Sequence, residues 1–147
     1  MANSLTNAGQ WMALGATSGG SVGGTKGSLA TAGIVLAADR IGLFSSATTP
    51  AKDGTGFTQI TGNGGDPKTI ADSNWTGSLS GSAPNANAQV VLADQTWTAS
   101  GAVNNIAGAY IFENAGGTAL AWWERSSAID LLSSDEIVAD DLTIRLS

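Results

Sequence analysis

The sequence predicts an all-β protein, an antiparallel β-sandwich or small barrel of jelly-roll-like type, with a short N-terminal helix or arm. Its apolar segments are short, and several alternate apolar with polar residues, which is the pattern of half-buried strands. Clusters of Gly, Pro, Asn, Asp and Ser separate these segments, and the 147 residues include 20 glycines. Short strands separated by turn residues are typical of sandwiches and small barrels.

The first 28 residues differ in pattern from the rest of the chain. Four apolar residues fall close to one face of a helix: Leu5, Ala8, Trp11 and Met12. This spacing predicts a short helix over 5–14. Residues 15–28 are rich in Gly and Ser, which predicts a linker or an arm that orders against a partner. We therefore divide the chain into an N-terminal helix and arm, 1–28, and a single β domain, 29–147.

The β domain begins with two strand signals separated by a turn. The apolar run 34–44 predicts a strand that ends near Phe44. Pro50 and Asp53-Gly54 then supply turn residues, because Pro fixes φ and Gly tolerates positive φ. Residues 57–60 alternate and predict a short second strand.

The middle of the domain repeats this arrangement. A second turn cluster, 62–67, precedes a looser strand region over 68–79, and a loop is expected over 80–87. Residues 89–93 form a continuous apolar run, which predicts a buried strand. Residues 96–98 are expected to continue extended, because β-branched threonines flank a tryptophan there.

A hairpin is the most strongly predicted element. Residues 106–113 and 118–125 are apolar and aromatic, and 114–117 (Asn-Ala-Gly-Gly) joins them. Asn and Gly tolerate the positive φ that tight hairpin turns demand. The hairpin also raises the question of function, since it holds two adjacent tryptophans.

Neighbouring residues of a strand point to opposite faces of a sheet. Tyr110 and Phe112 are therefore expected to share a face. Trp122 is expected to lie in the core with Leu120, whereas Trp123 points to the other side and needs a different cover. We interpret Trp123 as the better candidate for an assembly interface.

The C-terminal region supplies the last strands. Ile129 and Leu131 alternate with polar residues, and 133–136 predicts a turn. Residues 142–146 alternate again and predict a final half-buried strand.

Composition excludes several classes of function. The chain has no cysteine and no histidine, so disulfides, thiolate metal sites and histidine bases are excluded. Its net charge of −6, with six basic residues spread along the chain, argues against nucleic acid and anionic membrane partners. No apolar run is long enough to span a membrane, and the N-terminus lacks a signal-peptide pattern. We expect synthesis and assembly in the host cytoplasm.

Acidic residues are the remaining candidates for chemistry. Asp135-Glu136 and Asp140-Asp141 could bind a cation only if their oxygens converge, and neighbours on a strand diverge. Glu113 and Glu124 would need to lie about 5–10 Å apart in a cleft to act as a glycosidase pair. The segment 52–56 (Lys-Asp-Gly-Thr-Gly) lacks the complete calcium-loop and phosphate-loop patterns. We interpret all of these as turn or surface residues and predict no catalytic residue, metal or cofactor, and no enzyme.

Several separated motifs resemble those of small structural proteins of tailed-bacteriophage virions. They occur in order over about 40–147: RIGLFSSATTPAKDGTGFTQITG (40–62), LADQTW (92–97), NIAGAY (105–110), ALAWWER (119–125) and DEIVADDLTI (135–144). The sequence departs from this pattern at Gly64-Gly65-Asp66-Pro67, where a tyrosine often follows the glycines.

The resemblance implies a virion component. It points to a head decoration (cement) protein on the capsid exterior, bound to the major capsid protein and to copies of itself, with trimers expected. The alternative is a tail-fibre, tail-tip or baseplate domain that binds a host receptor or glycan. The candidate interface residues are Trp11, Met12, Trp75, Trp97, Trp123 and Arg125.

Overall fold

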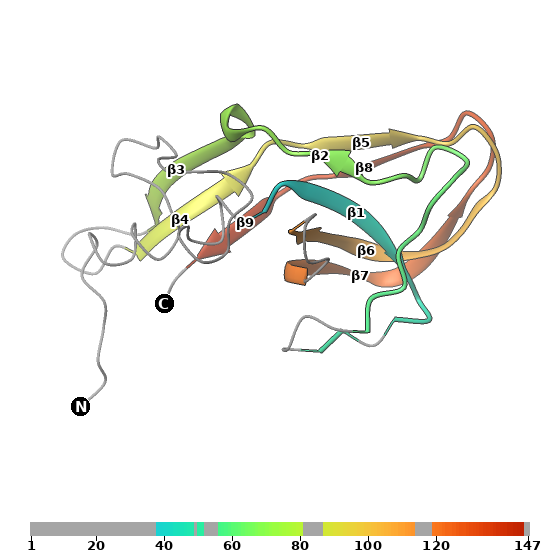
Figure 1. The fold of residues 1–147 in the computed structure, drawn as a ribbon, viewed down its shortest axis with the longest axis horizontal. Helices are drawn as coiled ribbons and strands as arrows, with labels where there is room; N and C mark the ends of the chain where they lie inside the picture. Colours follow the sequence, from blue (N-terminus) through green and yellow to red (C-terminus); the bar gives the residue numbers. More distant parts are fainter. Residues whose placement is uncertain (1–37, 49, 52–55, 81–86, 114–118, 146–147) are drawn as a thin grey trace. The chain divides into compact units, whose positions relative to one another are not determined.

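The computed structural model describes residues 38–48, 50–51, 56–80, 87–113 and 119–145 (Figure 1). This part of the chain is all-β with antiparallel sheets, as the sequence predicted. The strands are β1 (Arg40–Ser45), β2 (Lys68–Thr69), β3 (Trp75–Ser80), β4 (Asn87–Leu92), β5 (Gln95–Thr98), β6 (Val103–Phe112), β7 (Ala119–Leu131), β8 (Glu136–Ala139) and β9 (Leu142–Arg145). One short 3-10 helix, Asp72–Asn74, precedes β3. The expected helix over 5–14 and the arm 15–28 lie outside the described residues.

The strands fall into two compact units. The first unit contains the three-stranded sheet β3-β4-β9. The second unit, 38–70 with 94–140, contains the four-stranded sheet β2-β1-β6-β7 and the two-stranded sheet β5-β8. The features considered below all belong to the second unit unless stated otherwise.

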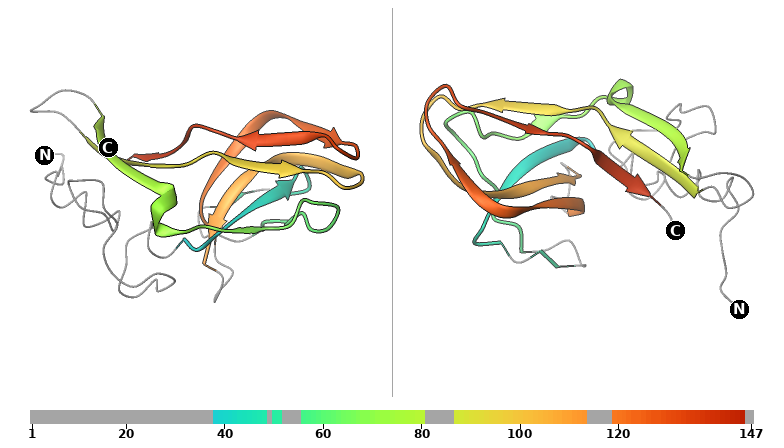
Figure 2. Two further views of the ribbon diagram at one scale, coloured as in Figure 1. Left: turned by 90° about the horizontal axis from the view of Figure 1, so that it is seen from above. Right: turned by 180° about the vertical axis from the view of Figure 1, so that it is seen from behind.

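In the second unit, one long antiparallel hairpin supplies four strands, β5 and β6 on one side and β7 and β8 on the other. Its register is the same at Gln95↔Ala139, Thr98↔Glu136 and Val103↔Leu131, because each step covers an equal number of residues on the two sides. In the first unit, β4 pairs with β9 from Gln89↔Arg145 to Leu92↔Leu142. Within the second unit, β6 and β7 turn back at one end into β5 and β8 (Figure 2). A hairpin that folds over itself in this way is the construction expected of a jelly-roll-like chain.

The central strands of the four-stranded sheet are buried on both faces. Side chains alternate between faces along a strand, so the register assigns each residue to a face. Ile41, Leu43, Ala109, Ile111, Ala121 and Trp123 share one face. Gly42, Phe44, Gly108, Tyr110, Trp122 and Glu124 share the other. Consecutive residues of β1 and β6 are buried because both faces of the sheet are covered at these strands.

A bulge shifts the start of β7 against β6. Ile111 pairs with Ala121, but the next residue of β6, Phe112, pairs with Ala119, so Leu120 is an extra residue on β7. As a result Ala119 joins the aromatic core, while Leu120 is only half-buried. The expectation that Leu120 would share the core with Trp122 is therefore wrong, because the bulge breaks the alternation on which it relied.

A second, larger bulge interrupts the middle of β7. Gly108 pairs with Glu124 and Ile106 pairs with Ile129, so one residue of β6 faces residues 125–128 of β7. All four residues of this segment are exposed. Bulges of this kind bend an edge strand and interrupt the row of backbone groups that another strand could pair with.

A type I′ turn follows the Phe57 segment. Asn63 and Gly64 have φ of 50° and 84°, and the Gly65 N–H donates to the Gly62 carbonyl at 2.9 Å. The Asp66 carboxylate accepts a second bond, from the Gly62 N–H at 2.9 Å. The predicted turn cluster over 62–67 is therefore confirmed.

This turn inserts into the place where the long hairpin folds over. The Asn63 carbonyl accepts from the Ser100 N–H at 2.9 Å, and its side-chain amide donates to the Ala102 carbonyl at 2.8 Å. Gly64 approaches so closely that a Cβ there would lie 2.1 Å from the Thr98 carbonyl oxygen. We call this region, residues 61–66 with 98–102 and 130–136, the corner.

The turn that closes the corner holds a non-glycine residue at positive φ. The Asp135 N–H donates to the Leu132 carbonyl at 3.0 Å, and the Ser134 N–H donates to the Ala99 carbonyl at 2.7 Å. Ser134 itself has a φ of 75°. A side chain in the left-handed region raises the energy of the residue by about 1–2 kcal/mol.

Ser134→Gly is therefore expected to raise the free energy of unfolding by up to about 1 kcal/mol, since part of the relieved strain is offset by the greater entropy of unfolded glycine. Urea unfolding at equilibrium measures the change. Ser133→Gly is the matched control, because Ser133 is not among the described residues with positive φ. An equal or lower stability for Ser134→Gly would contradict the argument.

Candidate functional site

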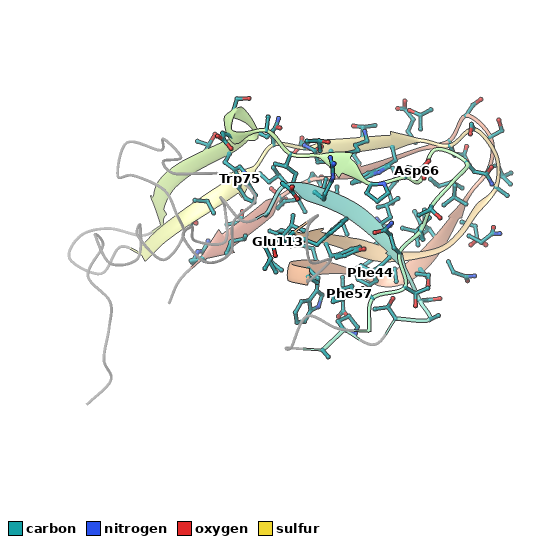
Figure 3. The ribbon with its side chains drawn as sticks, in the orientation of Figure 1. Phe44, Phe57, Asp66, Trp75 and Glu113 are labelled. Carbon is teal, nitrogen blue, oxygen red and sulfur yellow. The ribbon has the colours of Figure 1, made fainter. Side chains whose placement is uncertain are left out.

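One face of the four-stranded sheet carries a cluster of aromatic rings. The Tyr110 ring stacks between Phe57 and Phe112, with centroids 4.8 and 4.9 Å away and interplanar angles of 16° and 19°. Phe44 meets Phe57 edge-on at 5.4 Å, and the two lie side by side in Figure 3. Trp122 meets Phe57 edge-on at 5.9 Å and is half-buried. These geometries are the favoured arrangements of aromatic pairs, so the cluster is a packed core.

Two glycines make room for these rings. A Cβ on Gly42 would lie 3.3 Å from the Tyr110 ring and 3.4 Å from the Phe112 ring. A Cβ on Gly108 would lie 2.6 Å from the Phe44 ring. Rings that cover strand glycines shield the backbone there and help to fix strand register.

The phenol of Tyr110 is buried and hydrogen-bonded. Its hydroxyl donates to Gln59 Oε1 at 2.8 Å. Burial disfavours the phenolate and raises the pKa of Tyr110 to about 12. Because the chain contains one tyrosine, this group can be followed alone.

We expect absorbance at about 295 nm to show Tyr110 ionising near pH 12 in the folded protein and near pH 10 in denaturant. Between these values the unfolded chain releases the proton while the folded chain keeps it, so stability falls as the pH rises from about 10 to about 12. Tyr110→Phe should remove this part of the pH dependence. A folded protein whose tyrosine ionises near pH 10 would contradict the packing of the cluster.

Two of the candidate interface tryptophans are buried. Trp97 in β5 is 1% exposed, and its indole N–H donates to the Asp66 carbonyl at 3.0 Å. The Lys68 ammonium lies 5.2 Å from the centroid of its ring, a cation–π distance, and donates to the Thr96 carbonyl. Trp75, in the first unit, is 4% exposed, and its indole N–H has no hydrogen-bond partner among the residues that the structure describes. Neither ring offers a contact surface in this structure, and a role of Trp75 or Trp97 in an interface stays a prediction.

The other candidates lie in different places. Trp123 is half-buried on β7 and pairs with Ala109, on the face opposite the aromatic cluster. Arg125 is exposed in the large bulge of β7. Trp11 and Met12 lie outside the described residues. The structure thus places Trp123 and Arg125 two residues apart on β7.

The acidic pairs weighed in the sequence analysis also separate. Glu113 follows β6 directly, whereas Glu124 pairs with Gly108, five residues back along that strand. At about 3.3 Å per residue this is about 16 Å, too far for a glycosidase pair. Asp135 closes a turn, as expected of 133–136. Within the described residues, no group of three or more His, Cys, Asp or Glu side chains could hold a metal ion.

A feature that sequence reasoning missed is the exposed leucine of the corner. Leu132 is 68% exposed, the highest value among the large hydrophobic side chains described, followed by Val138 at 45%. Its N–H donates to Asp135 Oδ2 at 2.8 Å, so the turn that presents it is held by its own hydrogen bonds. The neighbouring Leu131 is buried. Sequence alternation alone could not tell which of the two leucines faces water, because the strand ends between them.

The comparisons of this chain with models of known families, with curated proteins and with solved structures found no match. In the described part of the chain, no helix has the length and apolar character needed to cross a membrane.

Proposed function

We propose that this protein is a structural component of a tailed-bacteriophage virion, and specifically a head decoration protein that binds the outer capsid shell. Its partners are then the major capsid protein and further copies of itself, with trimers as the expected assembly. A β domain that bridges neighbouring shell subunits adds contact area across their interfaces and so resists their separation.

The observation that supports this proposal is the position of the motifs in the fold. RIGLFS is β1, LADQTW ends β4 and enters β5, NIAGAY lies in β6, ALAWWER begins β7, and DEIVADDLTI covers β8 and most of β9. The resemblance to phage structural proteins therefore concerns the strands that build the sheets. A likeness confined to one loop would carry less weight.

The alternative, a tail-fibre, tail-tip or baseplate domain that binds a receptor or glycan, depends on exposed aromatic rings. Because Trp75 and Trp97 are buried, this role would rest on the half-buried Trp122 and Trp123. We therefore rank the alternative second.

Copy number per virion tests the proposal. A decoration protein is expected at on the order of hundreds of copies, in fixed ratio to the major capsid protein, since it follows the symmetry of the shell. Quantitative staining or mass spectrometry of purified particles gives this ratio. About a dozen copies, the number expected of a tail component, would contradict a head decoration role and favour the alternative.

A further inference from the structure

Arg125 differs from the other cationic side chains of the described residues. Arg40 donates to Thr69, Lys68 to the Thr96 carbonyl, and Arg145 to Gln89 at 3.1 and 3.2 Å. Arg125 has no hydrogen-bond or ion-pair partner within the described part of the chain. It lies in the exposed bulge 125–128, beside the half-buried Trp123.

The corner has the opposite charge. Asp130, Asp135 and Glu136 accept hydrogen bonds from the Asn105 N–H, the Leu132 N–H and the Thr98 hydroxyl, at 2.6, 2.8 and 3.1 Å respectively. Because each donor is neutral, none of these bonds cancels the charge of its carboxylate. These three carboxylates belong to the same corner as Leu132, the most exposed large hydrophobic side chain described, and one of them, that of Asp135, accepts from the Leu132 N–H.

We propose that copies of this chain associate head to tail, with the bulge Arg125–Ala128 of one copy seated on the acidic corner, Asp130–Glu136, of the next. Arg125 then approaches the carboxylates of the corner, and Leu132 is covered by the neighbouring copy. The inference rests on the part of the proposed function in which copies bind each other.

A second copy is the occupant that the charges favour. Each chain carries a net charge of −6, so like surfaces of two copies repel unless a positive group meets a negative one. A two-fold contact of corner with corner would oppose carboxylates, and a contact of bulge with bulge would oppose arginines. A contact of bulge with corner joins the two unlike surfaces, either reciprocally across a two-fold axis or head to tail. Head-to-tail contacts close into rings when the rotation permits, and a ring of three agrees with the expected trimer, so we take the head-to-tail form.

The two β7 bulges also direct association away from strand pairing. Leu120 and the segment 125–128 interrupt the edge of β7 on both sides of a short regular stretch. An interrupted edge is a poor template for an added strand. Side chains rather than backbone groups therefore carry the contact.

The contact is expected to be weak and sensitive to salt. Exposed ion pairs stabilise by only about 0.2–1 kcal/mol and are screened at high ionic strength. Burial of Leu132 supplies a larger, salt-independent part. Neighbours held on a shell would meet at high effective concentration, so weak affinity in solution suffices there.

Sedimentation of the full chain in solution tests the inference. Wild type is expected to form oligomers at low salt and to dissociate as salt is added. Arg125→Glu and Glu136→Lys should each weaken association by about tenfold or more, because each places like charges in contact. The double variant, Arg125→Glu with Glu136→Lys, should restore it, because the charges are exchanged.

Asp94→Lys is the matched control for Glu136→Lys, since it changes the net charge equally at an exposed residue outside the corner. It should leave association unchanged or strengthen it slightly. Leu132→Ser should weaken association at every salt concentration. Circular dichroism confirms that each variant is folded.

Three outcomes overturn the inference: a wild-type chain that stays monomeric up to about 1 mM, single variants that associate like wild type, or a double variant that shows no restoration. Each of these outcomes leaves the copy number on the virion unaffected. Failure of self-association is thus distinguishable from failure of the proposed decoration role.

Discussion

Gly64→Ala is expected to lower the free energy of unfolding by about 3 kcal/mol or more, and the variant is expected to be partly unfolded at room temperature. Two causes add at this position. The φ of 84° disfavours any side chain, and the new methyl group would lie 2.1 Å from the Thr98 carbonyl oxygen. A carbonyl in a strand cannot rotate away as a side chain can, so the turn must leave the corner. Its bonds to Ser100 and Ala102 would then be lost as well.

Gly62→Ala separates the two causes. Gly62 has a similar φ of 76°, but nothing lies within 4 Å of the position of its Cβ. The strain alone should lower the free energy of unfolding by about 1–2 kcal/mol. Urea unfolding of both variants, followed by tryptophan fluorescence, gives the comparison. If both variants lose the same free energy of unfolding, the corner can accommodate the methyl group at residue 64, and the close approach of Gly64 to Thr98 does not stabilise the long hairpin.

The sequence predicted several strands where alternation and turn residues agree, but residues 57–60, expected to form a short strand, contribute only the isolated bridge of Gln59 with Phe44. The hairpin of β6 and β7 and the shared face of Tyr110 and Phe112 follow directly from the period of two and the Asn-Ala-Gly-Gly connection. The all-β class follows from the same signals. These features depend on residues that are close together in the chain, so they can be read from the sequence.

Sequence reasoning failed where tertiary contacts decide. The Gly and Asn residues of 101–105 predict a turn, but β6 already begins at Val103, and Asn105 adopts a φ of 59° within it. The strand β8 was not recognised, because its Glu-Ile-Val-Ala segment is too short to show a period. Neither bulge of β7 has a local signature, since a bulge is set by the partner strand and the packing around it.

For the candidate site, too, some residues could be selected from the sequence and others could not. Arg125 was selected from the sequence, and its exposure agrees with a surface role. Trp97, selected as an interface residue, is buried, with Lys68 over its ring and its indole N–H on the Asp66 carbonyl, while Leu132, which was not selected, is exposed at the corner turn. Burial of a particular tryptophan depends on segments remote in sequence. Composition alone does not distinguish a core ring from a contact ring.

Gly108→Ala is the second substitution for which a large loss is expected, about 3 kcal/mol or more in the free energy of unfolding. A Cβ there would lie 2.2 Å from the Trp123 carbonyl oxygen and 2.6 Å from Cζ of Phe44. Phe44 is 1% exposed and packs edge-on against Phe57 and Tyr110, so its ring has no free space to enter. The methyl group must therefore push β7 away from β6 as well as loosen the aromatic cluster.

The control for Gly108→Ala is Gly42→Ala, on the neighbouring strand beneath other rings of the same cluster, those of Tyr110 and Phe112. Its Cβ would meet ring atoms at 3.3 and 3.4 Å, which small ring movements accommodate, so a change within about 1 kcal/mol is expected. Adding Phe44→Leu to Gly108→Ala removes the ring clash but leaves the carbonyl clash, so most of the loss should persist. Urea unfolding measures the stability of both variants.

The single tyrosine supplies a local readout of Gly108→Ala, because its pKa should fall from about 12 toward 10 as the cluster around Tyr110 loosens. A Gly108→Ala variant that keeps wild-type stability and tyrosine ionisation would show that β6 and β7 do not lie as close as this structure places them.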